Sequence, residues 1–157
     1  MTAFQWALFF HVLGVFLLVG GMLSADVASW RGAQTENLRQ LLALLAVVKT
    51  SDLAANGGAV MVLGFGLWLV HLGGFSYADA WVIAALALFV AQGAATGSVA
   101  GGRKRARVLA LELSERGEES SAEPASLLGS PTAIALTLLA NLITVTILVL
   151  MVWRPGG

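Results

Sequence analysis

Two histidines are the residues of this sequence best suited to cofactor chemistry. His11 lies inside the apolar run FFHVLGVFLLVGGM at residues 9–22, and His71 lies near the end of a second apolar run. Neutral imidazole is the commonest metal ligand, and two imidazoles from facing helices can hold a haem iron from both sides. Ionisable side chains inside membranes are costly and are therefore candidates for function. The pair predicts a metal or haem site, provided that the fold brings the two runs together.

The composition is that of a membrane protein. The chain has 157 residues, of which 58% are hydrophobic and 11% are charged, whereas about 25% of a typical soluble domain is charged. Four apolar runs reach the roughly 20 residues that a helix needs to cross a bilayer: 4–27, 53–73, 78–99 and 132–153. We therefore predict an all-α, polytopic membrane protein with a single domain over residues 1–157, folded as an antiparallel bundle of four transmembrane helices.

The basic residues predict the orientation of this bundle. Eight of the nine Lys and Arg side chains lie in two segments, 28–52 and 100–131, whereas the connection GGFSYADA between the second and third runs has none. The positive-inside rule places both basic segments in the cytoplasm and both termini outside, in a bacterial plasma membrane. An outer aromatic belt agrees with this orientation: Trp6, Tyr77, Trp81 and Trp153. Because the run RKRAR at 103–107 is explained as a topology determinant, we predict no nucleic-acid binding.

The predicted topology places the two histidines in the same leaflet. The first run enters the membrane from outside and the second run returns there, so His11 and His71 lie at similar depths on sequential helices, which are usually neighbours. We predict that both are axial ligands of a haem b near the outer face. The protein is then a b-type haem protein that serves electron transfer or haem-linked sensing, because an iron with two histidine ligands has no open position.

Four further residues belong to this predicted haem site. Gly14 and Gly64 lie on the faces of His11 and His71 and would leave room for the macrocycle. Trp68, one turn from His71, would pack on a ring edge, and Arg154 would pair with the propionates at the interface. Structural histidines that only bond a neighbouring helix remain an open alternative, as does a bare metal ion.

Two other function classes also remain open. A glycine ladder at Gly93, Gly97 and Gly101 lets another helix approach closely, so the chain is alternatively a non-catalytic partner subunit or a homo-oligomer that uses this face. A copper or small-ion permease is the third hypothesis. The chain contains no cysteine, which excludes thiolate metal sites and disulfides. Because the sequence has no hydrolytic motif, any chemistry would be that of a cofactor, and enzymatic activity is left open.

Polar residues near the basic segments complete the pattern. Asp26 ends the first run, and Lys49, Asp52 and Asn56 begin the second; we expect these groups to pair with one another at the cytoplasmic interface. Deeper in the bundle, Gln92 on the third run and Asn141, flanked by threonines, on the fourth run are expected to form hydrogen bonds between helices. Residues 36–52 form either an interfacial helix or an extension of the second run, and we expect a mobile loop in the acidic, serine-rich segment before residue 126.

The first run resembles a known family at four positions. In FHVLGVFLLVGGM, the histidine followed by small residues and a Gly-Gly pair is similar to the opening helix of a family of small bacterial predicted integral membrane proteins of unknown function, which resemble the copper-resistance D-like membrane proteins. The matching residues are His11, Gly14, Gly20 and Gly21. The resemblance implies a four-span fold and a role for His11 beyond packing, but it implies no particular activity.

Overall fold

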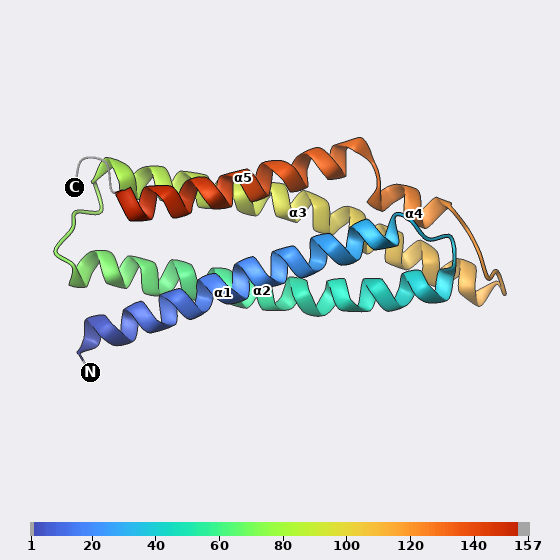
Figure 1. Ribbon diagram of the computed structural model, residues 1–157, viewed down its shortest axis with the longest axis horizontal. Helices are drawn as coiled ribbons and strands as arrows, with labels where there is room; N and C mark the ends of the chain where they lie inside the picture. The colour runs from blue at the N-terminus through green and yellow to red at the C-terminus, as the bar shows by residue number, and fades with distance from the viewer. Residues whose placement is uncertain (1, 154–157) are drawn as a thin grey trace.

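A computed structural model describes residues 2–153 of the chain as five helices (Figure 1). They are α1 (Ala3–Gly32), α2 (Leu38–Leu72), α3 (Ala80–Glu115), the short α4 (Glu123–Leu128) and α5 (Pro131–Trp153). Within the described residues, four stretches of helix are long and apolar enough to cross a membrane: α1, α2, α3 and the α4–α5 stretch. The predicted all-α fold with four spans is therefore confirmed.

Local sequence signals explain where these helices begin and end. The Thr2 hydroxyl accepts a hydrogen bond from Gln5 N while the Gln5 side chain accepts one from Thr2 N, which is a capping box at the start of α1. Asn37 caps α2 by accepting a bond from Gln40 N. Past the ends of α2 and α3, Gly74 and Gly117 adopt φ values of 72° and 84°, which glycine tolerates at low steric cost.

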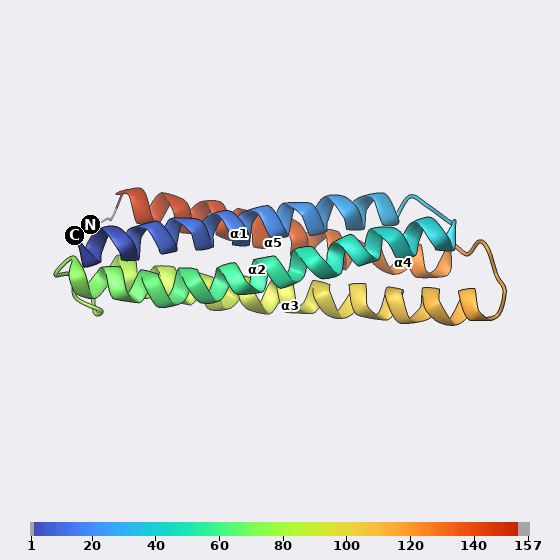
Figure 2. The same cartoon turned by 90° about the horizontal axis from the view of Figure 1, so that it is seen from below.

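The helices form two antiparallel pairs. Helix α1 packs along α2, and α3 packs along α5 (Figures 1 and 2). The start of α1 and the end of α5 lie at one end of the bundle together with the α2–α3 connection, which we call the terminal end. The opposite end holds α4 and the α1–α2 connection (Figure 1). We call it the basic end, because the two basic segments lie there.

Glycines let the backbones of α1 and α2 come into contact. A Cβ atom added to Gly58 would lie 2.6 Å from Gly14 O, and one added to Gly21 would lie 2.6 Å from Ser51 O. Both distances are shorter than real carbon–oxygen contacts, so only glycine fits at either position. Small residues are the usual means by which membrane helices approach closely, because lipid provides no hydrophobic driving force between them.

Helices α1, α2 and α3 continue beyond the predicted spans at the basic end. The leucine-rich segment 38–48 is an extension of α2 rather than a separate interfacial helix, which settles the alternative left open by the sequence. Three of its five leucines are buried, in a core of ten residues from α1, α2, α3 and α4: Ala25, Ala28, Leu38, Leu41, Leu45, Val48, Ala106, Ala110, Leu113 and Leu128. Burying a leucine contributes about 1.5–3 kcal/mol, so this core stabilises the basic end in the way that a soluble bundle is stabilised.

The acidic, serine-rich segment, for which the sequence predicts a mobile loop, forms backbone hydrogen bonds with the other connection at the basic end. Leu38 N donates to Glu119 O over 3.1 Å, and Ser121 N donates to Glu36 O over 2.8 Å. These bonds fasten the α3–α4 connection to the α1–α2 connection. These contacts could not be predicted, because composition reports the polarity of a segment, whereas backbone bonding to a distant loop depends on the tertiary fold; the mobility of the segment stays a prediction.

Candidate functional site

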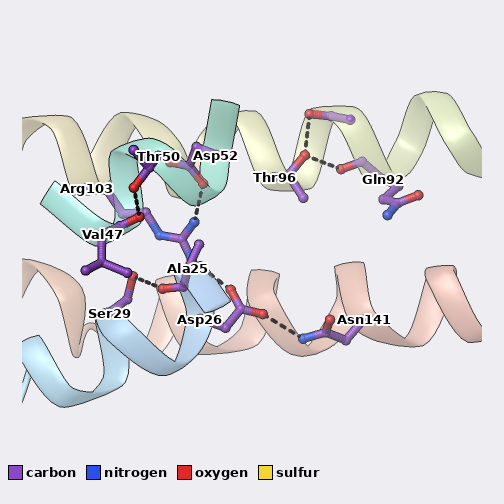
Figure 3. A network of polar contacts seen from close by, with 11 residues as sticks. Ala25, Asp26, Ser29, Val47, Thr50, Asp52, Gln92, Thr96, Arg103 and Asn141 are labelled. Atoms are coloured by element: carbon purple, nitrogen blue, oxygen red, sulfur yellow. Dashed lines mark hydrogen bonds and ion pairs between the residues drawn. The ribbon is translucent and has the colours of Figure 1, made fainter. Parts of the chain in front are cut away.

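An ion cluster joins the helices in the half of the bundle nearest the basic end (Figure 3). The Arg103 guanidinium donates through one terminal nitrogen to Asp26 Oδ1 at 2.7 Å and through the other to Asp52 Oδ1 at 3.0 Å. Asn141 Nδ2 donates to the second oxygen of Asp26 at 3.0 Å. Each of the four long helices supplies one of these groups, so the cluster links the α1–α2 pair to the α3–α5 pair.

The cluster corrects the pairing that the sequence suggested. Asp26 and Asp52 do lie together, as expected, but their partner is Arg103 on α3, and Lys49 is exposed. The sequence contains a signal for the position of Arg103, although its charge alone indicates only the topology of the chain. Gln92, Thr96 and Arg103 recur four and eleven residues apart, which is the spacing of one helix face.

The cluster carries an unbalanced charge. Two carboxylates share one guanidinium, so the three ionised groups sum to one negative charge. The Arg103 side chain is only 10% exposed, whereas those of Asp26 and Asp52 are 21% and 31% exposed. Asp26 is further satisfied by Asn141. Asp52 is therefore the more weakly compensated carboxylate of the two.

A second polar contact lies closer to the middle of the membrane. Gln92 is 4% exposed, and its amide nitrogen donates to Thr144 Oγ1 at 2.8 Å and to the Met22 sulfur at 3.2 Å. Together with the Asn141–Asp26 bond, this confirms that Gln92 and Asn141 form hydrogen bonds between helices. Thr96 donates to the Gln92 carbonyl oxygen at 2.9 Å (Figure 3). On this face of α3, Gln92 and Thr96 are separated from Arg103 by Val99 and Ala100.

A cavity of about 280 Å3 lies between the ion cluster and Gln92. Asp52 and Asn56 of α2 face it from one side, and Gln92, Thr96 and Arg103 of α3 face it from the other. Its apolar wall comes from four helices and includes Leu18, Met22, Ala55, Ala59, Phe89, Val99 and Ala140. We call this space the inner cavity. Its wall is mostly apolar, and the polar side chains of α2 and α3 interrupt it.

The two histidines have different surroundings. His11 is 8% exposed and faces α2, where its Nδ1 lies 3.1 Å from Val62 O. Because a carbonyl oxygen can only accept, Nδ1 carries the proton and Nε2 keeps the lone pair. His71 is exposed on α2. No contact described for residues 2–153 joins the two rings, so their shared ligation of haem stays a prediction.

The other residues of the predicted haem site are also dispersed. Gly14 does not leave open space, because a Cβ atom there would lie 2.8 Å from Met61 Cβ and 3.0 Å from Gly58 O. Gly64 does face open space, with nothing within 4 Å of an added Cβ. Trp68 is 42% exposed and contacts Phe65 in a tilted arrangement, with 6.1 Å between ring centroids. Arg154 lies outside the described residues.

The glycine ladder of α3 is open. An added Cβ atom at Gly93, Gly97 or Gly101 would meet nothing within 4 Å, so among the described residues no helix packs closely on this face. Gly93 and Gly97 line the inner cavity instead. The packing partner that the ladder suggested stays a prediction.

The fold and this site together define a class of protein. Many apolar side chains are exposed along the helices, among them Phe16 at 74%, Val60 at 74% and Leu142 at 64%, while polar groups meet inside the bundle. This inside-out distribution is that of a multi-pass integral membrane protein. The chain belongs to the family of predicted integral membrane proteins designated DUF2269, whose profile matches residues 6–155. Comparison with curated proteins and with solved structures gives no match.

Proposed function

We propose that this protein binds a small monovalent cation in the inner cavity and acts as a permease for it. The observation that carries the proposal is the charge of the cluster: Asp26 and Asp52 share the single guanidinium of Arg103 beside a cavity that several polar side chains help to line. One negative charge in a region of low dielectric is costly unless a cation or proton compensates it. Intramembrane ionisable groups that face a cavity are typical of ion pathways.

The donor atoms favour a hard cation. Asp52, Asn56, Gln92 and Thr96 offer carboxylate, amide and hydroxyl oxygens to the cavity, and oxygen donors suit hard ions. Met22 is the one sulfur-bearing side chain in the described lining, whereas copper(I) prefers several soft ligands. No group of three His, Cys, Asp or Glu side chains among residues 2–153 is arranged to hold a metal ion. A monovalent ion such as Na⁺ matches the single unbalanced charge.

The position of the cavity suggests the direction of entry. Its lining extends from Asp26, Asp52 and Arg103 to Leu18 and Phe89, which places it at mid-length of the bundle and in the half of the predicted spans nearest the basic end. With the orientation predicted by the positive-inside rule, an ion enters from the cytoplasm. Release on the other side requires the two helix pairs to separate, and their mutual contacts are sparse compared with the contacts inside each pair.

Cation-dependent thermal stability of the full chain tests this proposal. The unfolding midpoint is measured in mild detergent with NaCl and with N-methylglucamine chloride at equal ionic strength. A ligand at 100 times its Kd stabilises a protein by about 2.7 kcal/mol, so we expect Na⁺ to raise the midpoint by several degrees. Asp52→Asn should abolish the increase, whereas Glu118→Gln, which removes the same charge from an exposed position of the α3–α4 connection, should retain it.

Two outcomes would overturn the proposal. The first is an equal midpoint in both salts for the wild-type protein. The second is a midpoint that follows pH but not Na⁺, which would mean that the excess carboxylate binds a proton. If binding is found, Na⁺ uptake into proteoliposomes, compared between the wild type and Asp52→Asn, tests the permease role separately.

Haem binding is a second candidate, and the His11 contact is the observation that favours it. A metal-ligating histidine commonly donates its other ring N–H to a backbone carbonyl, which fixes the tautomer; His11 bonds Val62 O in this way. His11 and His71 would hold the iron, and the group would supply electron transfer. Oxidised and dithionite-reduced spectra of protein expressed with haem provide the test. A Soret band that both His11→Ala and His71→Ala remove supports this candidate, and a folded protein without the band excludes it.

A further inference from the structure

A second and larger space lies on the other side of Arg103. Its volume is about 750 Å3, and it is bounded by α1, α3, α4 and α5 near the basic end. Arg103 and Asp26 border both spaces, whereas Asp52 borders only the inner cavity. We call this second space the interfacial cavity, because it lies where the chain leaves the predicted membrane core. Trp30 in its wall is 60% exposed, as expected of an interfacial aromatic residue.

The charge of the interfacial cavity is opposite to that of the inner cavity. Its described lining contains one acidic side chain, Asp26, and two basic ones, Arg103 and Arg105, which sum to one positive charge. The Asp26 carboxylate is already bound by Arg103 and by Asn141. Arg105 is exposed and forms no ion pair with any residue of 2–153. The positive charge therefore faces the cavity without a partner from the described chain.

A buried donor in the same wall also lacks an acceptor. The Arg103 side chain is nine-tenths buried, and its Nε atom has no hydrogen-bond partner among the described residues. Buried donors are nearly always satisfied in folded proteins. Because less than 1 Å2 of this nitrogen is accessible, an acceptor in the cavity reaches it only if the Arg103 side chain shifts. Guanidinium groups bind phosphate oxygens well because their planar donors match the spacing of these oxygens.

Much of the remaining wall is apolar and exposed to lipid, although serine and threonine side chains also line it. Val27 is 57% exposed, Ile134 is 50% exposed and Leu138 is 64% exposed, and all three border the cavity. A ligand that satisfies both parts of the wall has an anionic headgroup and an acyl chain. Basic pockets between membrane helices on the cytoplasmic side are typical binding sites of anionic lipid headgroups. Free phosphate would satisfy the arginines but would leave the apolar wall uncovered.

We propose that the interfacial cavity binds one anionic phospholipid, with its phosphate at Arg103 and Arg105 and an acyl chain along Val27, Ile134 and Leu138. The site lies beside the proposed cation site and differs from it in lacking Asp52. It shares Arg103 with that site, so a bound phosphate would compete with Asp26 and Asp52 for the Arg103 guanidinium.

Native mass spectrometry of the full chain in detergent tests this proposal. Phosphatidylglycerol and phosphatidylcholine of equal chain length are added separately, and the fraction of protein carrying one lipid is measured. One arginine near a membrane surface contributes about 1 kcal/mol toward an anionic lipid, which corresponds to about fivefold in affinity. We therefore expect a preference for phosphatidylglycerol that Arg105→Gln lowers about fivefold, while Arg116→Gln, an exposed arginine outside the cavity, leaves it unchanged.

A steric variant tests the same site without a change of charge. Gly101 borders the interfacial cavity, and an added Cβ atom there would meet nothing within 4 Å, so Gly101→Leu should fill the space without disturbing the helices. Gly20→Leu is the matched control, because Gly20 is equally open and borders neither cavity. We expect Gly101→Leu to lower phosphatidylglycerol binding and Gly20→Leu to retain it.

Three results would overturn the proposal. They are equal binding of the two lipids by the wild type, equal losses in Arg105→Gln and Arg116→Gln, and equal losses in the two leucine variants. Inorganic phosphate provides a further comparison: if millimolar phosphate displaces phosphatidylglycerol completely, the site recognises a free anion rather than a lipid.

Discussion

The ion cluster predicts that Arg103 is a main determinant of bundle stability. Arg103→Gln leaves Asp26 and Asp52 facing each other without a cation. Removing one partner of a fully buried ion pair costs about 3–5 kcal/mol, whereas an exposed pair contributes only about 0.2–1 kcal/mol. Arg103 is 10% exposed, but its two carboxylate partners are 21% and 31% exposed. We therefore expect a loss of about 2–3 kcal/mol, below the fully buried value.

The assay is unfolding in mixed micelles of mild detergent and dodecyl sulfate, followed by tryptophan fluorescence. Arg116→Gln is the control, because Arg116 is exposed and forms no ion pair within residues 2–153; its effect should stay within about 0.5 kcal/mol. A double-mutant cycle with Asp26→Asn isolates the interaction. Since the two side chains are in contact, we expect a coupling energy of about 1–2 kcal/mol.

Two results would refute this reasoning. If Arg103→Gln costs less than about 1 kcal/mol, the cluster behaves as a surface ion pair, and water rather than protein surrounds it. If the two substitutions add within about 0.5 kcal/mol, Arg103 and Asp26 do not stabilise each other, and the link between the helix pairs resides in the apolar core of the basic end.

Two further predictions concern packing and orientation. Gly58→Val should destabilise the protein by more than about 3 kcal/mol, the upper end of ordinary overpacking, because an added Cβ atom meets the α1 backbone. Gly57→Val should cost far less, because its Cβ atom meets nothing within 4 Å. The same unfolding assay compares the two variants, and equal losses would contradict the described contact between α1 and α2. Because the chain has no cysteine, single-cysteine variants report orientation directly: an impermeant maleimide should label Ser76→Cys in intact cells and Glu118→Cys only after permeabilisation, and the reverse pattern would place the basic end outside.

The sequence predicted several polar contacts but not their partners. Depth along a helix follows from residue number at about 1.5 Å per residue, so Asp26 and Asp52 could be placed at one level, and Gln92 and Asn141 could be expected to bond across helices. To predict the Arg103 contact, one needs to know the rotation of α3 about its axis and how far the long Arg103 side chain extends. Neither quantity is encoded in hydropathy or in the count of basic residues.

The prediction of a haem site likewise lacked the orientation of the side chains. Sequence position placed His11 and His71 in one leaflet, but it did not specify which way each ring points. In the described structure His11 faces α2 and His71 is exposed. Gly14, expected to leave space, instead allows contact between helices. A glycine in a membrane helix is compatible with either role, and only the position of the neighbouring helix distinguishes them.

The sequence by itself determined the class of this protein. Four runs of apolar residues and two basic segments require a multi-pass membrane bundle, because a single apolar run can cross lipid only if its backbone groups pair within the run, as they do in a helix. Only the tertiary structure decided where the charges meet. The packing of α1 on α2 and of α3 on α5 brings two carboxylates to one guanidinium. It leaves two cavities beside this guanidinium, and the net charges of their linings are opposite in sign. That outcome depends on helix rotation and side-chain reach, which are set by close packing rather than by hydropathy.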